Sequence, residues 1–188
     1  INSFGSIAMA GSTASANVEG FVYNAMNAVY QTALSFTSQN YGAGKMNRVT
    51  KILLYCLGLV VMVGAVMGGG AVLIGPKLLQ IYSSDPEVIS YGMMRMRIIN
   101  GSYFLCGIMD TMVGGLRGLG YSVVPMLVSL TGACLFRVVW IFSVFAMHRT
   151  LTTLYISYPV SWIITFTAHI ICYIVIRKRI AARRKPRD

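Results

Sequence analysis

Long apolar runs constrain this chain more than any other feature of its sequence. Stretches of about 20 mostly apolar residues, the length that crosses a bilayer as a helix, occur at residues 17–38, 52–75, 91–116, 124–147 and 154–176. None alternates polar and apolar residues, as a strand of a membrane barrel would. We therefore predict an all-α, polytopic transmembrane bundle over residues 1–176.

The opening of the chain reads as part of a further helix. Residues 1–11 are apolar and small, begin at Ile1, and carry neither a basic region nor a cleavage site of the kind found in signal peptides. We interpret the sequence as a fragment of a longer protein. The prediction is a lobe of six helices, of which the first, residues 1–11, is incomplete.

Positive charge is distributed unevenly between the two sides of the predicted bundle. The chain has 16 Lys and Arg against 5 Asp and Glu, a formal net charge of +11. Alternate connections carry most of the cations: Lys45, Arg48, Lys51, Arg117, Arg177, Lys178, Arg179, Arg183, Arg184, Lys185 and Arg187. Such a bias marks the cytoplasmic side, so residues 177–188 are predicted to form a basic cytoplasmic tail. Membrane lipid explains this charge better than nucleic acid, and we expect no nucleic-acid partner.

Two charged residues lie deep in predicted membrane helices. Asp110 lies within residues 91–116, and Arg137 lies near the middle of residues 124–147. A carboxylate at the centre of a membrane helix costs about 2.5 to 3.5 kcal/mol to insert, which indicates a functional role or a fixed partner. We consider Asp110 a candidate for coupling to H⁺ or Na⁺, with a structural ion pair as the alternative. Arg137 is expected to pair with Asp110 or with Glu19, the other intramembrane acid, and the alternative is that it tunes a substrate or ion site.

The segment 17–38 carries polar residues on one helical face. Asn24, Asn27 and Gln31 follow one another at spacings of three and four, and such a face is unfavourable against lipid. It lines either a cavity or another helix. Tyr23 and Tyr30, with Met26, form a neighbouring stripe that could contact apolar or cationic compounds or simply pack.

No residue pattern supports catalysis or metal binding. The four cysteines are scattered one per apolar segment, without a metal-ligand spacing, and no motif of a hydrolase or metalloprotease is present. We expect a protein that is not an enzyme and that has no cofactor. Two GxxxG pairs, Gly64 with Gly68 and Gly114 with Gly118, predict places where helices approach closely.

Three motifs, in order along the chain, resemble one family. The stretches NAVYQTALSFTSQNYGAGKMNRV at 27–49, GGLRGLGYSVVPM at 114–126 and FRVVWI at 136–141 look like the C-terminal lobe of the multidrug and toxic compound extrusion family. The resemblance implies an antiporter of twelve helices in two six-helix lobes, which exports organic, often cationic, compounds in exchange for H⁺ or Na⁺. Its missing partner would be the N-terminal lobe of the same chain. Asp110 lies on the helix where some members carry a coupling carboxylate.

Two other functions remain open from the sequence. A lipid-linked oligosaccharide or polysaccharide flippase of similar architecture would need a more basic cavity than this chain offers. A membrane scaffold that transports nothing would not need a buried acid and a polar helix face. On all of these interpretations we expect an integral protein of a bacterial inner or plasma membrane, with the C-terminus in the cytoplasm.

Overall fold

The computed structural model describes residues 1–184 and is helical almost throughout. Its elements in chain order are η1 (Asn2–Phe4), α1 (Ser6–Gly42), α2 (Met46–Leu73), α3 (Gly75–Gln80), α4 (Pro86–Ile99), η2 (Asn100–Ser102), α5 (Tyr103–Gly118), α6 (Val123–Ser129), η3 (Leu130–Leu135), α7 (Phe136–Phe142), α8 (Val144–Met147) and α9 (Leu151–Arg184). No strand occurs among these residues, and the predicted all-α class is confirmed.

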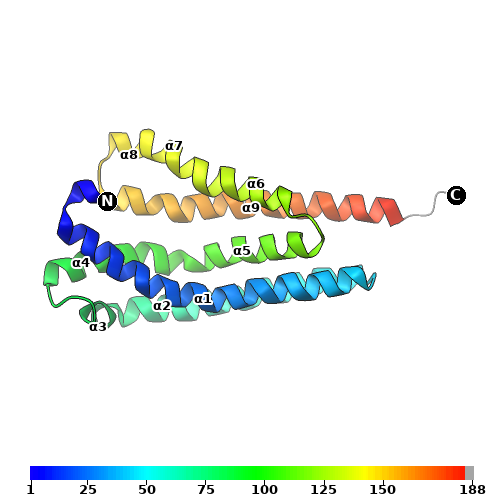
Figure 1. The fold of residues 1–188 in the computed structure, drawn as a ribbon, viewed down its shortest axis with the longest axis horizontal. Helices are drawn as coiled ribbons and strands as arrows, with labels where there is room; N and C mark the ends of the chain where they lie inside the picture. The colour runs from blue at the N-terminus through cyan, green and yellow to red at the C-terminus, as the bar shows by residue number, and fades with distance from the viewer. Residues whose placement is uncertain (185–188) are drawn as a thin grey trace.

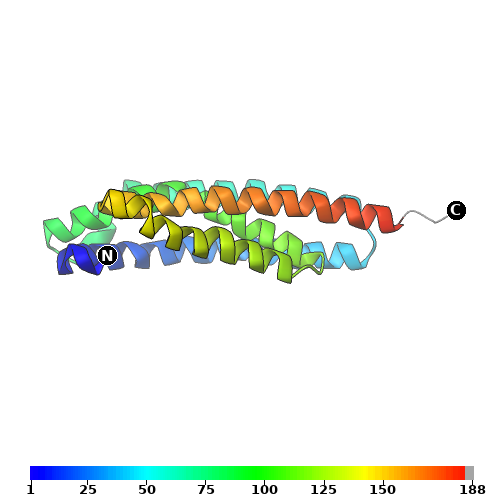
Figure 2. The same ribbon diagram turned by 90° about the horizontal axis from the view of Figure 1, so that it is seen from above.

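The long helices lie side by side along one axis (Figures 1 and 2). The α1–α2 turn, the α5–α6 turn and the C-terminal part of α9 share one end of the bundle, and α3, the start of α4 and the α8–α9 connection share the other. Viewed from above, α1 and the α6–α8 segment lie on one side, and α2 and α9 lie on the other (Figure 2). The predicted basic connections are thus at a single end, which also contains residues 177–184 as the last turns of α9. The rest of the predicted tail, residues 185–188, lies outside the described residues.

Three helices of the described part are long and apolar enough to cross a membrane: Met46–Leu73, Val123–Met147 and Leu151–Ala182. The first two of these match the predicted segments 52–75 and 124–147 closely in position. The predicted segment 91–116 is α4 and α5, interrupted by the 3-10 turn η2. Pro86 is the first residue of α4, and the Asp85 carboxylate caps this helix by accepting a hydrogen bond of 2.8 Å from the Glu87 amide.

The predicted separation of residues 1–11 from residues 17–38 is wrong. Both belong to α1, which runs without a break from Ser6 to Gly42. The small, polar residues between them lower the hydropathy because they make helix contacts, not because they form a loop. A Cβ on Gly11 would lie 2.8 Å from the Gly92 amide nitrogen, so α1 and α4 touch there through their backbones.

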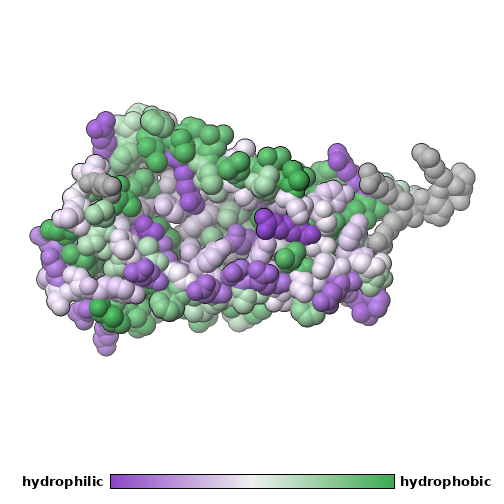
Figure 3. All heavy atoms as spheres, viewed as in Figure 1, coloured by the Kyte–Doolittle hydropathy of each residue, from purple (hydrophilic) through white to green (hydrophobic). Residues whose placement is uncertain are grey.

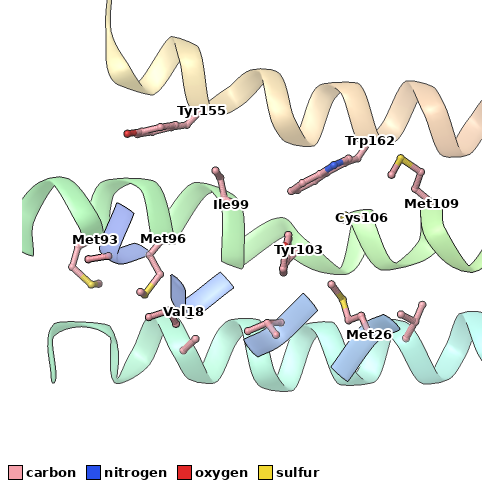
Figure 4. Close-up of a cluster of buried hydrophobic side chains, with 14 of the residues drawn as sticks. Val18, Met26, Met93, Met96, Ile99, Tyr103, Cys106, Met109, Tyr155 and Trp162 are labelled. Carbon is pink, nitrogen blue, oxygen red and sulfur yellow. The ribbon is translucent and has the colours of Figure 1, made fainter. Parts of the chain in front are cut away.

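The buried core lies between α1, α2, α5 and α9. Tyr155 and Trp162 extend from α9 toward the α4–α5 helix, and Met26 of α1 lies against α2 (Figure 4). The rings of Tyr103 and Trp162 are 5.6 Å apart between centroids. Glycines at Gly64, Gly68, Gly114 and Gly118 each face another helix at a distance that a Cβ would fill, so the predicted close approaches are confirmed.

Candidate site at the α1–α5 interface

The predicted polar face of α1 is open in the described part of the chain. Asn24 and Gln31 are exposed and Asn27 is half-buried. Figure 3 shows hydrophilic side chains gathered across the middle of the molecule, beneath a more apolar band over α6–α8. The face therefore does not pack against another helix among the described residues. Of the two roles left open by the sequence, a cavity lining or a contact with another helix, the second is not observed within this part of the chain.

Asp110 lies at the edge of this face. It is half-buried on α5, where α5 packs along α1, and its carboxylate interacts with the Tyr23 hydroxyl. Arg117, two turns further along α5, also acts on the carboxylate through its charge. The Arg117 guanidinium donates a hydrogen bond of 2.9 Å to the Tyr30 hydroxyl. Tyr23 and Tyr30 on α1 thus face Asp110 and Arg117 on α5, because both pairs are seven residues apart and the two helices run in parallel.

Met26 does not line a cavity. The side chain is only 2% exposed, and its sulfur would lie 2.9 Å from a Cβ at Gly107 and 3.2 Å from one at Gly64. Three residues beyond Tyr23, it points into the space between α2 and α5 that these two glycines leave. Of the two roles left open for Met26, packing is the one observed, because the thioether fills a gap in the core.

Glu19 is paired, but not with Arg137. Its two carboxylate oxygens accept hydrogen bonds of 2.8 Å and 2.9 Å from Arg95 of α4, and Ser15 donates a third of 3.0 Å. The Arg95 guanidinium also lies 5.7 Å from the centroid of the Tyr155 ring. Arg95 is buried and lies more than two turns inside α4, which begins at Pro86.

Arg137 has no acidic partner among the described residues, so its predicted pairing with Asp110 or Glu19 is wrong. Its Nε donates a hydrogen bond of 3.0 Å to Ser161 Oγ on α9. The guanidinium lies over the Tyr158 ring, 4.0 Å from the centroid, and 5.9 Å from the Trp162 ring. Aromatic faces carry negative charge, and they stabilise the cation here in place of a carboxylate. Tyr158, Ser161 and Trp162 were missed by the sequence analysis, although their spacing of three and four on one helix is a detectable signal.

The titratable groups form no metal site in the part of the chain that the structure describes. His169 is fully buried and its Nε2 lies 3.1 Å from Ser129 Oγ, whereas His148 is exposed at the α8–α9 connection. The four cysteines are free thiols.

The sequence matches one known protein family. The family model MatE matches residues 1–143. The chain belongs to the MatE family. This confirms the resemblance to the multidrug and toxic compound extrusion family that the three motifs indicated. No match was found among curated protein sequences.

A solved structure has the same fold. It is described as the inward-facing conformation of a multidrug resistance MATE family transporter of the MOP superfamily, and the chain resembles it with a TM-score of 0.72 at 15% identity. The match covers 97% of this chain and 43% of that one. The chain thus spans less than half the length of this MatE structure, in agreement with one lobe of a two-lobe protein.

Proposed function

We propose that the protein containing this chain is a secondary active antiporter. It exports organic compounds, cationic or neutral and amphipathic, in exchange for H⁺ or Na⁺, and alternates between inward- and outward-facing states. Membership of the MatE family supports a transporter, and the described residues supply the C-terminal lobe. The N-terminal lobe of the same chain would close the other side of the central cavity.

One observation carries the proposal: Asp110 is partly buried and has no ion-pair partner among the described residues. Among the described residues the ion pair is that of Glu19 with Arg95, and Asp110 has no such fixed partner. It is half-buried next to the open polar face of α1, where a small cation could reach it. A carboxylate that is desolvated but unpaired can bind a cation in one state of the transporter more tightly than in the other, and that difference drives the conformational equilibrium.

The cations at one end of the bundle support an orientation of the protein in the membrane. Lys45, Arg48, Arg117 and Arg177 lie in or next to the α1–α2 turn, the α5–α6 turn and the last turns of α9, at one end of the bundle. By the positive-inside bias, we propose that this end and the C-terminus lie on the cytoplasmic side of an inner or plasma membrane.

Substitution of Asp110 tests the coupling role. In the full-length protein, Asp110→Asn keeps the shape of the side chain but removes its charge, so export driven by a H⁺ or Na⁺ gradient in proteoliposomes should be lost at an unchanged protein level. Glu87→Gln, an exposed acid at the start of α4, serves as the control and should export normally. Unchanged export by Asp110→Asn would remove Asp110 from the coupling role.

A further inference from the structure

Arg137 is a membrane-embedded cation whose hydrogen-bonding capacity is mostly unused. A guanidinium has five N–H donors, and here only Nε, bonded to Ser161 Oγ, has a hydrogen-bond acceptor among the described residues. The four N–H groups on the two Nη atoms have none. Ser161 lies ten residues into α9, which is about 15 Å from the start of that helix at 1.5 Å per residue, so water at the membrane surface does not hydrate this group.

Two aromatic rings lie next to the Arg137 guanidinium. Tyr158 covers one face of the guanidinium at 4.0 Å, and the ring of Trp162, which is almost fully buried, lies to the side at 5.9 Å. Ser161, which accepts the hydrogen bond from Nε, is fully buried, so the guanidinium lies on the side of α7 that faces α9. Asp110 forms no ion pair with Arg137. The edge of the guanidinium that carries the Nη donors therefore has no acceptor or acidic partner among the described residues.

An acceptor that matches this edge must be planar and negatively charged. A carboxylate has two oxygens at the spacing of the two Nη donors and forms paired, charge-assisted hydrogen bonds. The adjacent Tyr158 and Trp162 rings offer apolar contact to an aromatic group attached to the carboxylate. A cationic group at this position would be repelled by Arg137.

We propose that Arg137, with Tyr158 and Trp162, forms a binding site for the carboxylate of an aromatic compound carried by the transporter. This inference rests on the proposed transport function and adds one substrate class to it. Such a compound is bound by its acid group on the α7–α9 side of the lobe, while Asp110 on α5 remains available to the coupling ion.

A matched set of probes tests the site. We suggest equilibrium binding of 2-naphthoate, 2-naphthamide and 2-naphthyltrimethylammonium to the purified full-length protein, because the three share one ring and differ in charge. The unsubstituted protein should bind the naphthoate best. Arg137→Gln should weaken naphthoate binding roughly tenfold to a hundredfold, the usual range for a lost hydrogen bond to a charged group, and leave the other two within about twofold. Arg149→Gln, an exposed cation at the α8–α9 connection, is the control and should leave all three unchanged.

Two milder variants test the site if Arg137→Gln does not fold. Arg137→Lys keeps the charge but loses the planar fork, and Ser161→Ala removes the acceptor that orients it, so both should weaken naphthoate binding by a smaller factor. If Arg137→Gln weakens the binding of all three probes equally, the proposed site is overturned. The guanidinium would then pair with a carboxylate elsewhere in the protein or stabilise the packing of α7. Naphthoate binding that no Arg137 variant changes would overturn it as well.

The outcomes also separate this site from the proposed function. A protein that exports a cation under an ion gradient but binds naphthoate no better than naphthamide keeps the antiport function and loses the carboxylate site. A protein that binds naphthoate through Arg137 yet moves no compound under any gradient keeps the site and loses the antiport function.

Discussion

Glu19 and Arg95 lie 76 residues apart in the sequence, and two hydrogen bonds of 2.8 Å and 2.9 Å join them inside the bundle. The pair connects α1 to α4, and the Arg95 guanidinium also lies near the rings of Tyr155 and Tyr158 on α9. Three helices are thus held together near the start of the predicted segment 17–38.

Removal of one partner of this ion pair should be costly. Glu19→Gln or Arg95→Met leaves a buried charge without compensation, and such changes typically lower the free energy of unfolding by about 3 to 5 kcal/mol. The double variant Glu19→Gln with Arg95→Met buries no charge and should recover part of the loss. Melting temperatures of the purified full-length protein measure this, with Glu87→Gln as an exposed control. A double variant less stable than either single one would contradict the pairing.

Gly68 and Gly69 are neighbours on α2 in opposite situations. A Cβ on Gly68 would lie 2.5 Å from the Asn100 carbonyl oxygen, whereas one on Gly69 meets nothing within 4 Å. Gly68→Ala should force α2 away from η2 and lower the stability by about 1 to 3 kcal/mol. Gly69→Ala should leave the melting temperature unchanged or raise it slightly. Equal effects of the two variants would show that α2 does not contact η2 in the native protein.

Asn100 should be a stabilising site for substitution. Its side chain is 1% exposed, and neither Oδ1 nor Nδ2 has a hydrogen-bond partner. An unsatisfied buried amide costs about 1 to 3 kcal/mol, so Asn100→Leu, whose heavy atoms branch at Cγ in the same way, should raise the melting temperature. Asn100→Ala is the comparison, since it leaves a cavity and should gain less. A large decrease with Asn100→Leu would mean that the amide has a partner in the complete protein.

Tyr23 should affect export more than Tyr30 does. Tyr23→Phe removes the hydroxyl that interacts with Asp110, and loss of a polar interaction of about 0.5 to 1.5 kcal/mol should lower the rate of ion-driven export roughly twofold to tenfold. Tyr30→Phe removes the bond to Arg117 instead and should leave the rate nearly unchanged. Initial rates in proteoliposomes at matched protein amounts distinguish the two. The reverse order would favour Arg117 over Asp110 as the residue that matters for transport.

The sequence predicts which residues of the site share a helix face, but not which neighbouring helix covers that face. Periodicity identified the polar face of Asn24, Asn27 and Gln31, and the same reasoning placed Met26 on a neighbouring stripe, where its side chain in fact faces the core. A helical wheel shows which residues share a face but not which neighbour covers it. The neighbour that covers Met26 depends on how closely α2 and α5 approach each other. Gly64 and Gly107 leave room for the Met26 side chain there because they have no side chains.

The sequence alone determined that this chain lies in a membrane as a helical bundle, and which of its ends is basic. Both follow from local quantities, the length of apolar runs and the position of Lys and Arg, that no packing can change. Only the tertiary structure decided that Glu19 pairs with Arg95, that Arg137 lies on aromatic rings, and that Asp110 stays without an ion-pair partner. A charge inside a membrane protein must find compensation, but its partner depends on which residues of distant helices reach the same depth and face, and that is a property of the whole bundle.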